Sequence, residues 1–150
     1  MSLLKIGDKA PDFSAPVQTG EQRSLKDYKG KKLVVFFYPK DNTPTCTTEA
    51  CNLRDNYKNF QTNGYELLGV NADSEKKHQN FIKKFDLPFD LLVDADHSIA
   101  KAFGAWGEKK MFGKTYEGIL RSTFVIDENG VIEKVIDKVK AVEHSEQIMS

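Results

Sequence analysis

Both cysteines of the chain lie in the stretch Phe36-Phe37-Tyr38-Pro39-Lys40-Asp41-Asn42-Thr43-Pro44-Thr45-Cys46-Thr47-Thr48-Glu49-Ala50-Cys51. An apolar run, Leu33 to Tyr38, leads into it and predicts a buried strand, because it is short, β-branched and aromatic, and bounded by two lysines and a proline. A polar loop follows. Apolar residues then recur at steps of four and three, as on one face of a helix, at Cys46, Ala50, Leu53, Tyr57 and Phe60. The stretch therefore predicts a strand, a loop and a helix that runs to about Thr62.

The start of this helix places a cysteine in its first turn. Pro44 suits the first helical position with Thr43 as the cap, and a start one residue later, with Thr45 as the cap, is the alternative. Free backbone N–H groups and the helix dipole stabilise a thiolate there, and such sites lower a cysteine pKa from about 8.5 to roughly 3.5–7.5. Cys46 is therefore a candidate nucleophile. The alternative is a buried cysteine that packs as a small apolar side chain.

The pattern Pro39-x-x-x-Thr43-x-x-Cys46 resembles the active-site signature of peroxiredoxins. The second cysteine, Cys51, is similar in its spacing to the resolving cysteine of the bacterioferritin-comigratory-protein or PrxQ branch, which lies in the same helix. Further matches extend the resemblance over nearly the whole chain: Gly7-Asp8-Lys9-Ala10-Pro11-Asp12-Phe13, Ala105-Trp106-Gly107-Glu108-Lys109 and Gly118-Ile119-Leu120-Arg121-Ser122-Thr123-Phe124-Val125-Ile126-Asp127.

The resemblance implies a thiol peroxidase that acts in antioxidant defence. Cys46 would attack hydrogen peroxide or an organic hydroperoxide and become a sulfenic acid. Cys51 would then form an intrachain disulfide with Cys46, and thioredoxin or a glutaredoxin-like protein would reduce it. No metal, haem or flavin is expected to take part.

Four neighbours of the cysteines have a role by the resemblance, and three of them also have a second interpretation without it. Arg121 would favour the thiolate and, with Thr43, stabilise the leaving oxygen; the alternative is an arginine on the solvent side of its strand. Glu49 would hold Arg121, or only supply a favourable charge near the helix start. Pro39 would shield the thiolate from water, or only end the strand.

The remaining chain alternates strands and helices. We expect a hairpin or extended edge over 11–20, a capped helical turn over 24–28, a strand over 65–70, a helix over 75–86, a strand over 91–93, a short helix near 99–103, a long surface loop over 104–118, a hairpin over 120–136 and a helix after 140. This order predicts a single α/β domain over 1–150, with a thioredoxin-like central mixed β-sheet flanked by helices.

Length and composition exclude several classes of function. The 150 residues carry 22 acidic and 22 basic side chains. The sequence therefore has no excess of positive charge that would predict binding to nucleic acid. No apolar run is long enough to span a membrane, and residues 1–6 lack the features of a signal peptide. A cytoplasmic protein is expected, with a periplasmic or organelle form processed before residue 1 as the alternative. We expect a monomer, with a weak dimer as the alternative.

The histidines and acidic residues give weaker signals. Asp94, Asp96 and His97 are close enough for a metal site, but a cap on the following helix is the preferred interpretation. His78 and His144 are expected to be structural or exposed. No metal-binding pairs of cysteine or histidine occur, and no glycine-rich phosphate loop predicts a nucleotide cofactor.

Two other functions fit a pair of cysteines. A thioredoxin-like disulfide oxidoreductase or chaperone would exchange the pair with protein thiols, although such proteins usually carry Cys-x-x-Cys. A redox sensor would form the same disulfide without turnover. Catalytic consumption of peroxide separates the peroxidase from both.

Overall fold

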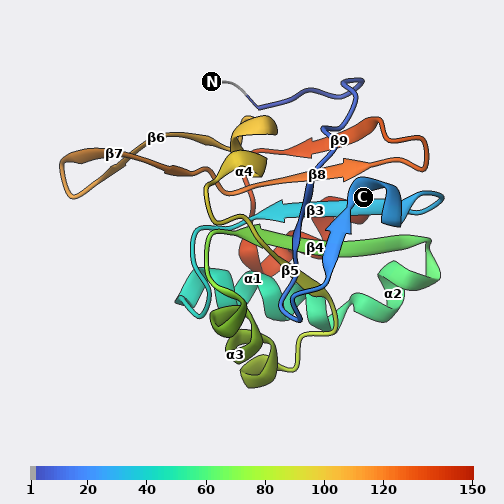
Figure 1. Cartoon of the computed structure of the whole chain (residues 1–150), viewed down its shortest axis with the longest axis horizontal. Helices are drawn as coiled ribbons and strands as arrows, with labels where there is room; N and C mark the ends of the chain where they lie inside the picture. The colour runs from blue at the N-terminus through green and yellow to red at the C-terminus, as the bar shows by residue number, and fades with distance from the viewer. Residues whose placement is uncertain (1–2) are drawn as a thin grey trace.

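The computed structural model describes residues 3–150, and a five-stranded mixed sheet forms its centre (Figure 1). The strand order is β5-β4-β3-β8-β9. The first three of these strands run parallel, and β8 is antiparallel to both β3 and β9. The predicted mixed sheet is confirmed, with the strands β3 (Lys32–Phe37), β4 (Tyr65–Asn71), β5 (Asp90–Val93), β8 (Ser122–Ile126) and β9 (Ile132–Ile136).

Strand β3 is buried on both faces because its side chains alternate between two cores. Leu33, Val35 and Phe37 pack on the side of the short helix α4 (Ser98–Ala102). Their neighbours in sequence pack on the opposite side, against the helices α1 (Pro44–Asp55), α2 (Tyr57–Thr62), α3 (Glu75–Phe85) and α5 (His144–Met149). Helices therefore cover both faces of the sheet, and the apolar run in the sequence is explained.

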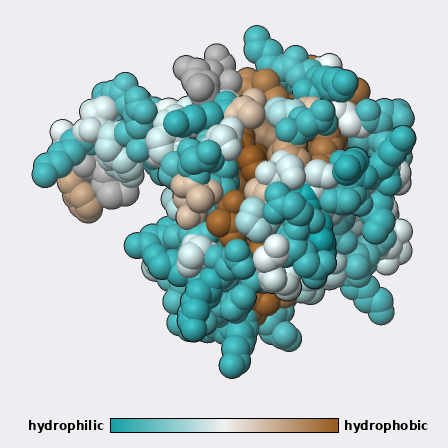
Figure 2. Space-filling view, viewed as in Figure 1, coloured by the Kyte–Doolittle hydropathy of each residue, from teal (hydrophilic) through white to brown (hydrophobic). Residues whose placement is uncertain are grey.

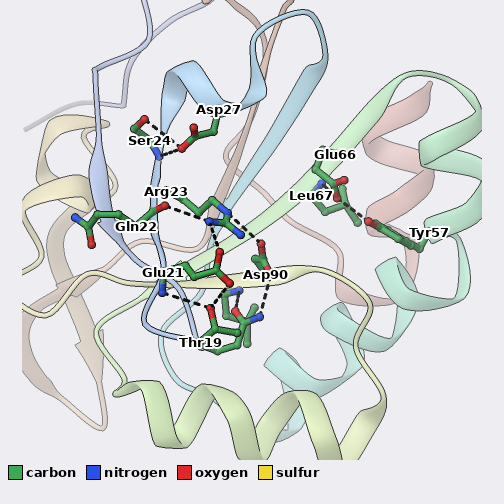
Figure 3. A network of polar contacts seen from close by, with 12 residues as sticks. Thr19, Glu21, Gln22, Arg23, Ser24, Asp27, Tyr57, Glu66, Leu67 and Asp90 are labelled. Atoms are coloured by element: carbon green, nitrogen blue, oxygen red, sulfur yellow. Dashed lines mark hydrogen bonds and ion pairs between the residues drawn. The ribbon is translucent and has the colours of Figure 1, made fainter.

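The N-terminal segment covers the β5 edge of the sheet. Strand β1 (Ser14–Pro16) pairs with β2 (Gln22–Ser24), and a 3₁₀ turn, η1 (Leu25–Tyr28), follows. Arg23 contacts both Glu21 and Asp90, which ties this hairpin to β5 (Figure 3). The predicted hairpin and capped turn are confirmed, and the network protects an edge that would otherwise present unpaired backbone groups.

The segment expected as a long surface loop is a hairpin instead. Strands β6 (Trp106–Met111) and β7 (Lys114–Ile119) pair over their whole length and project from the body of the protein (Figure 1). Figure 2 shows that this arm is mostly hydrophilic on the visible face. Phe112 and Gly113 both have positive φ, as a two-residue hairpin turn requires. The loop prediction was wrong because lysine-rich strands without an apolar face give no buried-strand pattern.

The helix after the cysteines is also shorter than predicted. It ends at Asp55, and a separate helix, α2, begins after Asn56, whose φ and ψ are −110° and 7°. The side-chain amide of Asn56 donates to the Asn52 carbonyl at 2.8 Å, which competes with helix continuation. Cys46 and Cys51 both lie within α1. A separate helix, α5, preceded by the turn η2 (Ala141–Glu143), forms after 140 as expected.

Candidate active site

Cys46 lies in the first turn of α1, directly after the loop that follows β3. Thr43 has the extended backbone of a cap and Pro44 occupies the first helical position, so the earlier of the two predicted starts is confirmed. The Thr43 carbonyl accepts from the Thr47 N–H at 2.8 Å, but its side chain caps no N–H group. The N–H groups of Thr45 and Cys46 therefore stay available at the positive end of the helix, and Cys46 as a residue is only 2% exposed.

Arg121 reaches this sulfur from the neighbouring strand. It directly precedes Ser122, which pairs with Phe37 at the end of β3. This register brings Arg121 to the edge of the sheet from which the Cys46 loop starts. Its Nη2 donates to the Cys46 sulfur at 3.0 Å, and its Nη1 forms an ion pair with Glu49. Of the two orientations considered for Arg121, the structure has the one that faces the cysteine.

Glu49 supplies the anion that a part-buried guanidinium requires. It lies one helical turn after Cys46 and its side chain is 1% exposed. Burial by itself lowers the pKa of Arg121, but the charge of Glu49 and the contact with Cys46 outweigh burial and raise that pKa above its ordinary value. Arg121 therefore keeps its positive charge beside the sulfur.

Pro39 and Arg121, whose guanidinium contacts the Cys46 sulfur, line an open cavity of about 590 Å³. Its wall includes Tyr116 and Lys109 from the β6–β7 arm. Burial lowers the pKa of Lys109, and repulsion by Arg121 lowers it further, while Cys46 acts in the opposite direction. The arm therefore places a second cation close to Arg121, a contribution that the expected surface loop did not include.

The Thr43 hydroxyl already donates its proton to a backbone carbonyl. It donates to the Lys40 carbonyl at 3.0 Å. A hydroxyl has one proton, so in this arrangement Thr43 offers only lone pairs to any further partner. The loop from Pro39 to Thr43 is thereby held in a compact turn before α1.

Cys51 is part-buried, and neither cysteine forms a disulfide in this structure. In a regular helix, residues five apart have Cα atoms roughly 8.6 Å apart, calculated from the helix rise and radius. A disulfide needs about 4.4–6.8 Å. The reduced α1 therefore keeps the two sulfurs apart.

The structure also places the histidines and acidic residues considered from the sequence. Asp94 accepts from the N–H groups of Ile99 and Ala100, and Asp96 accepts from Ser98, so both cap α4 as preferred. Among residues 3–150, no group of three or more potential ligands could hold a metal ion.

Buried histidines proved harder to place from sequence. His78 is buried against Asp41, in agreement with a structural role. His144 is also buried, but it lies 3.0 Å from Glu49, beside the site. Sequence reasoning missed this position, because the polar tail that carries His144 has no pattern that points to the cysteines.

The sheet, its helices and the cysteine at the start of α1 define a thioredoxin-like peroxiredoxin fold. The family model AhpC/TSA matches residues 6–135. The chain is 50% identical over 141 residues to peroxiredoxin Bcp of Bacillus subtilis, with 94% of this chain and 90% of that protein covered. It is 46% identical over 150 residues to peroxiredoxin Bcp of Escherichia coli K12, with 100% and 96% covered.

A solved structure of the bacterioferritin comigratory protein of Xanthomonas campestris, described for its alkyl peroxide reduction activity, is 35% identical. It superposes with a TM-score of 0.88 over 99% of this chain and 94% of that one. The chain therefore belongs to the AhpC/TSA family, and within it to the Bcp and PrxQ peroxiredoxins, which are peroxidases. The resemblance seen in the sequence is confirmed.

Proposed function

We propose that this chain reduces hydrogen peroxide and organic hydroperoxides with Cys46 as the nucleophile and Cys51 as the resolving cysteine. The observation that carries this proposal is the position of the Cys46 sulfur, at a helix start and 3.0 Å from Arg121 Nη2. A cation and helix N–H groups favour the thiolate, which is the reactive form of cysteine.

In the first step the thiolate attacks one peroxide oxygen. An S–O bond forms, the O–O bond breaks, and the leaving oxygen takes up a proton to become water or an alcohol. Cys46 is oxidised by two electrons to a sulfenic acid. Arg121 and the N–H groups of the first turn stabilise the charge on the oxygens. Because the Thr43 proton is donated to Lys40, Thr43 accepts the O–H of the bound peroxide, a different contribution from the one expected from sequence.

In the second step Cys51 attacks the sulfenic acid and releases water, which leaves an intrachain disulfide. A dithiol protein such as thioredoxin or a glutaredoxin-like protein then reduces this disulfide by exchange. Both cysteines lie on one helix, so a single chain completes the cycle and a monomer suffices. A cytoplasmic location fits a cycle that depends on dithiol reductants. Among the described residues, none of the helices is both long and apolar enough to span a membrane.

A coupled turnover assay tests this function. Reduced protein is supplied with NADPH, thioredoxin reductase and thioredoxin, or with a glutaredoxin system, and with either hydrogen peroxide or an alkyl hydroperoxide. We expect peroxide-dependent NADPH oxidation over many cycles. Consumption of one equivalent of peroxide with every reductant would instead support a sensor, and exchange with protein disulfides without peroxide turnover would support an oxidoreductase.

Substitution of Arg121 should affect both the thiolate and the reaction. Arg121→Ala removes the donor to the sulfur and should move the ultraviolet titration of the thiolate to higher pH. Each pH unit of this shift corresponds to about 1.4 kcal/mol of lost preference for the thiolate. It should also slow peroxide reduction by about 10²–10³-fold, as loss of one preorganised donor does in other enzymes. Arg121→Lys keeps the charge but not the two-pronged geometry, so its titration and its rate should lie between those of the wild type and Arg121→Ala.

The matched control is Arg23→Ala, which breaks an ion pair with Glu21 and Asp90 on the far edge of the sheet. It should leave both the titration and the rate unchanged. If Arg121→Ala titrates and reacts like the wild type, Arg121 has no part in the site.

A further inference from the structure

His144 is a buried imidazole beside the site that the reaction above does not use. It is the first residue of α5 and is 0% exposed. Its Nε2 lies 2.7 Å from the Thr123 hydroxyl and its Nδ1 lies 3.0 Å from Glu49 Oε2. The imidazole packs nearly perpendicular to the ring of Phe36, with the ring centres 6.2 Å apart. The side chain is therefore held on several sides and has a defined orientation.

These contacts close a ring with the residues already described. Thr123 lies in β8 and Arg121 directly precedes this strand, and the side chains of both reach the pair formed by Glu49 and His144. Arg121 contacts Cys46 and Glu49, and Thr123 reaches Glu49 through His144. The C-terminal helix is thereby connected to the cysteine through three side chains, His144, Glu49 and Arg121.

The partners decide where the imidazole carries its proton. A carboxylate oxygen only accepts, so His144 Nδ1 must carry a proton where it faces Glu49; otherwise two lone pairs would meet at 3.0 Å in a buried site. The Thr123 hydroxyl can either donate to Nε2 or accept from it. Nδ1 and Oε2 are close but are not aligned as a hydrogen bond, so the contact is an electrostatic attraction between the N–H and the carboxylate.

This attraction bears on how Glu49 binds the arginine. Arginine and carboxylate groups commonly form two parallel hydrogen bonds. Here Glu49 uses only Oε1 on Arg121 Nη1, while Oε2 is turned to His144. Nη2 of Arg121 is left for the Cys46 sulfur. Without the imidazole N–H, the buried Oε2 would also lose this electrostatic attraction, and Arg121 Nη2 could serve as its donor instead of donating to the sulfur.

We propose that His144 is a positioning residue that limits the Glu49–Arg121 pair to one hydrogen bond, between Arg121 Nη1 and Glu49 Oε1. Arg121 Nη2 then stays available to donate to the sulfur and to the peroxide. The proposal rests on the proposed function of Cys46. It predicts that loss of the imidazole N–H weakens the action of Arg121 on Cys46 while Arg121 itself is intact.

The first test compares His144→Phe, which keeps a ring but removes the donor, with His144→Asn, whose amide N–H replaces Nδ1–H. The readouts are the pH titration of the thiolate and the rate constant with hydrogen peroxide. We expect His144→Phe to titrate at higher pH and to react about tenfold more slowly, because the buried carboxylate loses its electrostatic attraction to the imidazole N–H and turns toward Arg121 Nη2. His144→Asn should recover most of the wild-type behaviour.

A second pair of variants keeps the proposal testable if His144→Phe does not fold. Thr123→Val removes the hydroxyl that orients the imidazole with little change in shape, and Thr123→Ser retains it. Thr123→Val should shift both readouts in the same direction as His144→Phe, and Thr123→Ser should not.

Met149→Ala is the control for a general loosening of α5, because Met149 contacts Asn59 and lies outside the polar ring. Wild-type readouts in both His144→Phe and Thr123→Val would overturn the proposal, as would an equal shift in Met149→Ala. Peroxide reduction by the wild type with unaffected variants contradicts this inference alone, whereas no reduction by the wild type contradicts the proposed function.

Discussion

Cys46→Ser should abolish peroxide consumption. A serine hydroxyl at this position is almost un-ionised at neutral pH, so neither the helix start nor Arg121 has a thiolate to stabilise. Removal of a covalent nucleophile costs several orders of magnitude in rate. The substitution changes one atom in a fully packed site, so the fold should remain, and circular dichroism would verify it. The measurement is the decay of hydrogen peroxide after mixing with excess reduced protein.

Cys51→Ser is the matched variant, with the same change of atom on the same helix. It should consume one equivalent of peroxide and then stop as a sulfenic acid, unless an added thiol rescues it. The two variants together assign the order of the cysteines. Turnover by Cys46→Ser, or a single equivalent consumed by Cys46→Ser and none by Cys51→Ser, would reverse the assignment.

Oxidation should unwind the first helix. The Cα atoms of Cys46 and Cys51 are roughly 8.6 Å apart in a regular helix, beyond the limit of about 7 Å for a disulfide without backbone movement. α1 must therefore open for the bond to form. Glu49 would move with the opened turns, so the hold on Arg121 would loosen and the peroxide site would be dismantled. The exposed disulfide would then be accessible to a reductant.

Amide hydrogen exchange measures this opening. Residues 44–55 should be protected in the reduced protein and exchange like an unfolded segment in the oxidised protein. The loss should extend to Ser145, because its N–H donates to the Asn52 side chain at 2.8 Å, and the Asn52 amide donates to the Val142 carbonyl at 3.0 Å. Opening of α1 removes both contacts, so the start of α5 should also lose protection.

Two controls separate the disulfide from oxidation itself. Cys51→Ser treated with peroxide stops before the disulfide and should keep its protection over 44–55. α4 packs on the opposite face of the sheet from α1 and should exchange equally in both states. Equal protection of α1 in reduced and oxidised wild type would show that the disulfide forms without unwinding, and the peroxidase assignment would stand without this step.

The strands and the site were largely predictable because local pattern and burial agree there. The apolar run 33–38 predicted a buried strand, which the structure shows to be buried on both faces, and Pro44 predicted the start of the helix that carries Cys46. Arg121 attracted attention as a charge within an apolar segment, and the structure supplies its anion. In each case the residue type is uncommon or energetically unfavourable except in one environment: a buried strand, a helix start or an ion pair.

The misses occurred where local pattern carries no information. The β6–β7 arm has no buried face, so its strands lack apolar alternation, and only the turn at Phe112 and Gly113 reveals it. The break at Asn56 was hidden because the apolar spacing continues through it into α2. His144 is brought to Glu49 by the packing of α5 against α1, a tertiary contact between segments that are distant in sequence.

The most direct test of the account is the mass of one tryptic peptide after wild-type protein reacts with one equivalent of hydrogen peroxide. Cleavage after Lys40 and Arg54 releases residues 41–54, which contain both cysteines. Without reduction before digestion, this peptide should be two hydrogen atoms lighter than its reduced form, with the peroxide consumed. An unchanged peptide mass with the peroxide left unconsumed, or a pair of these peptides joined from two chains, would contradict the assignment of Cys46 and Cys51 to one intrachain catalytic cycle.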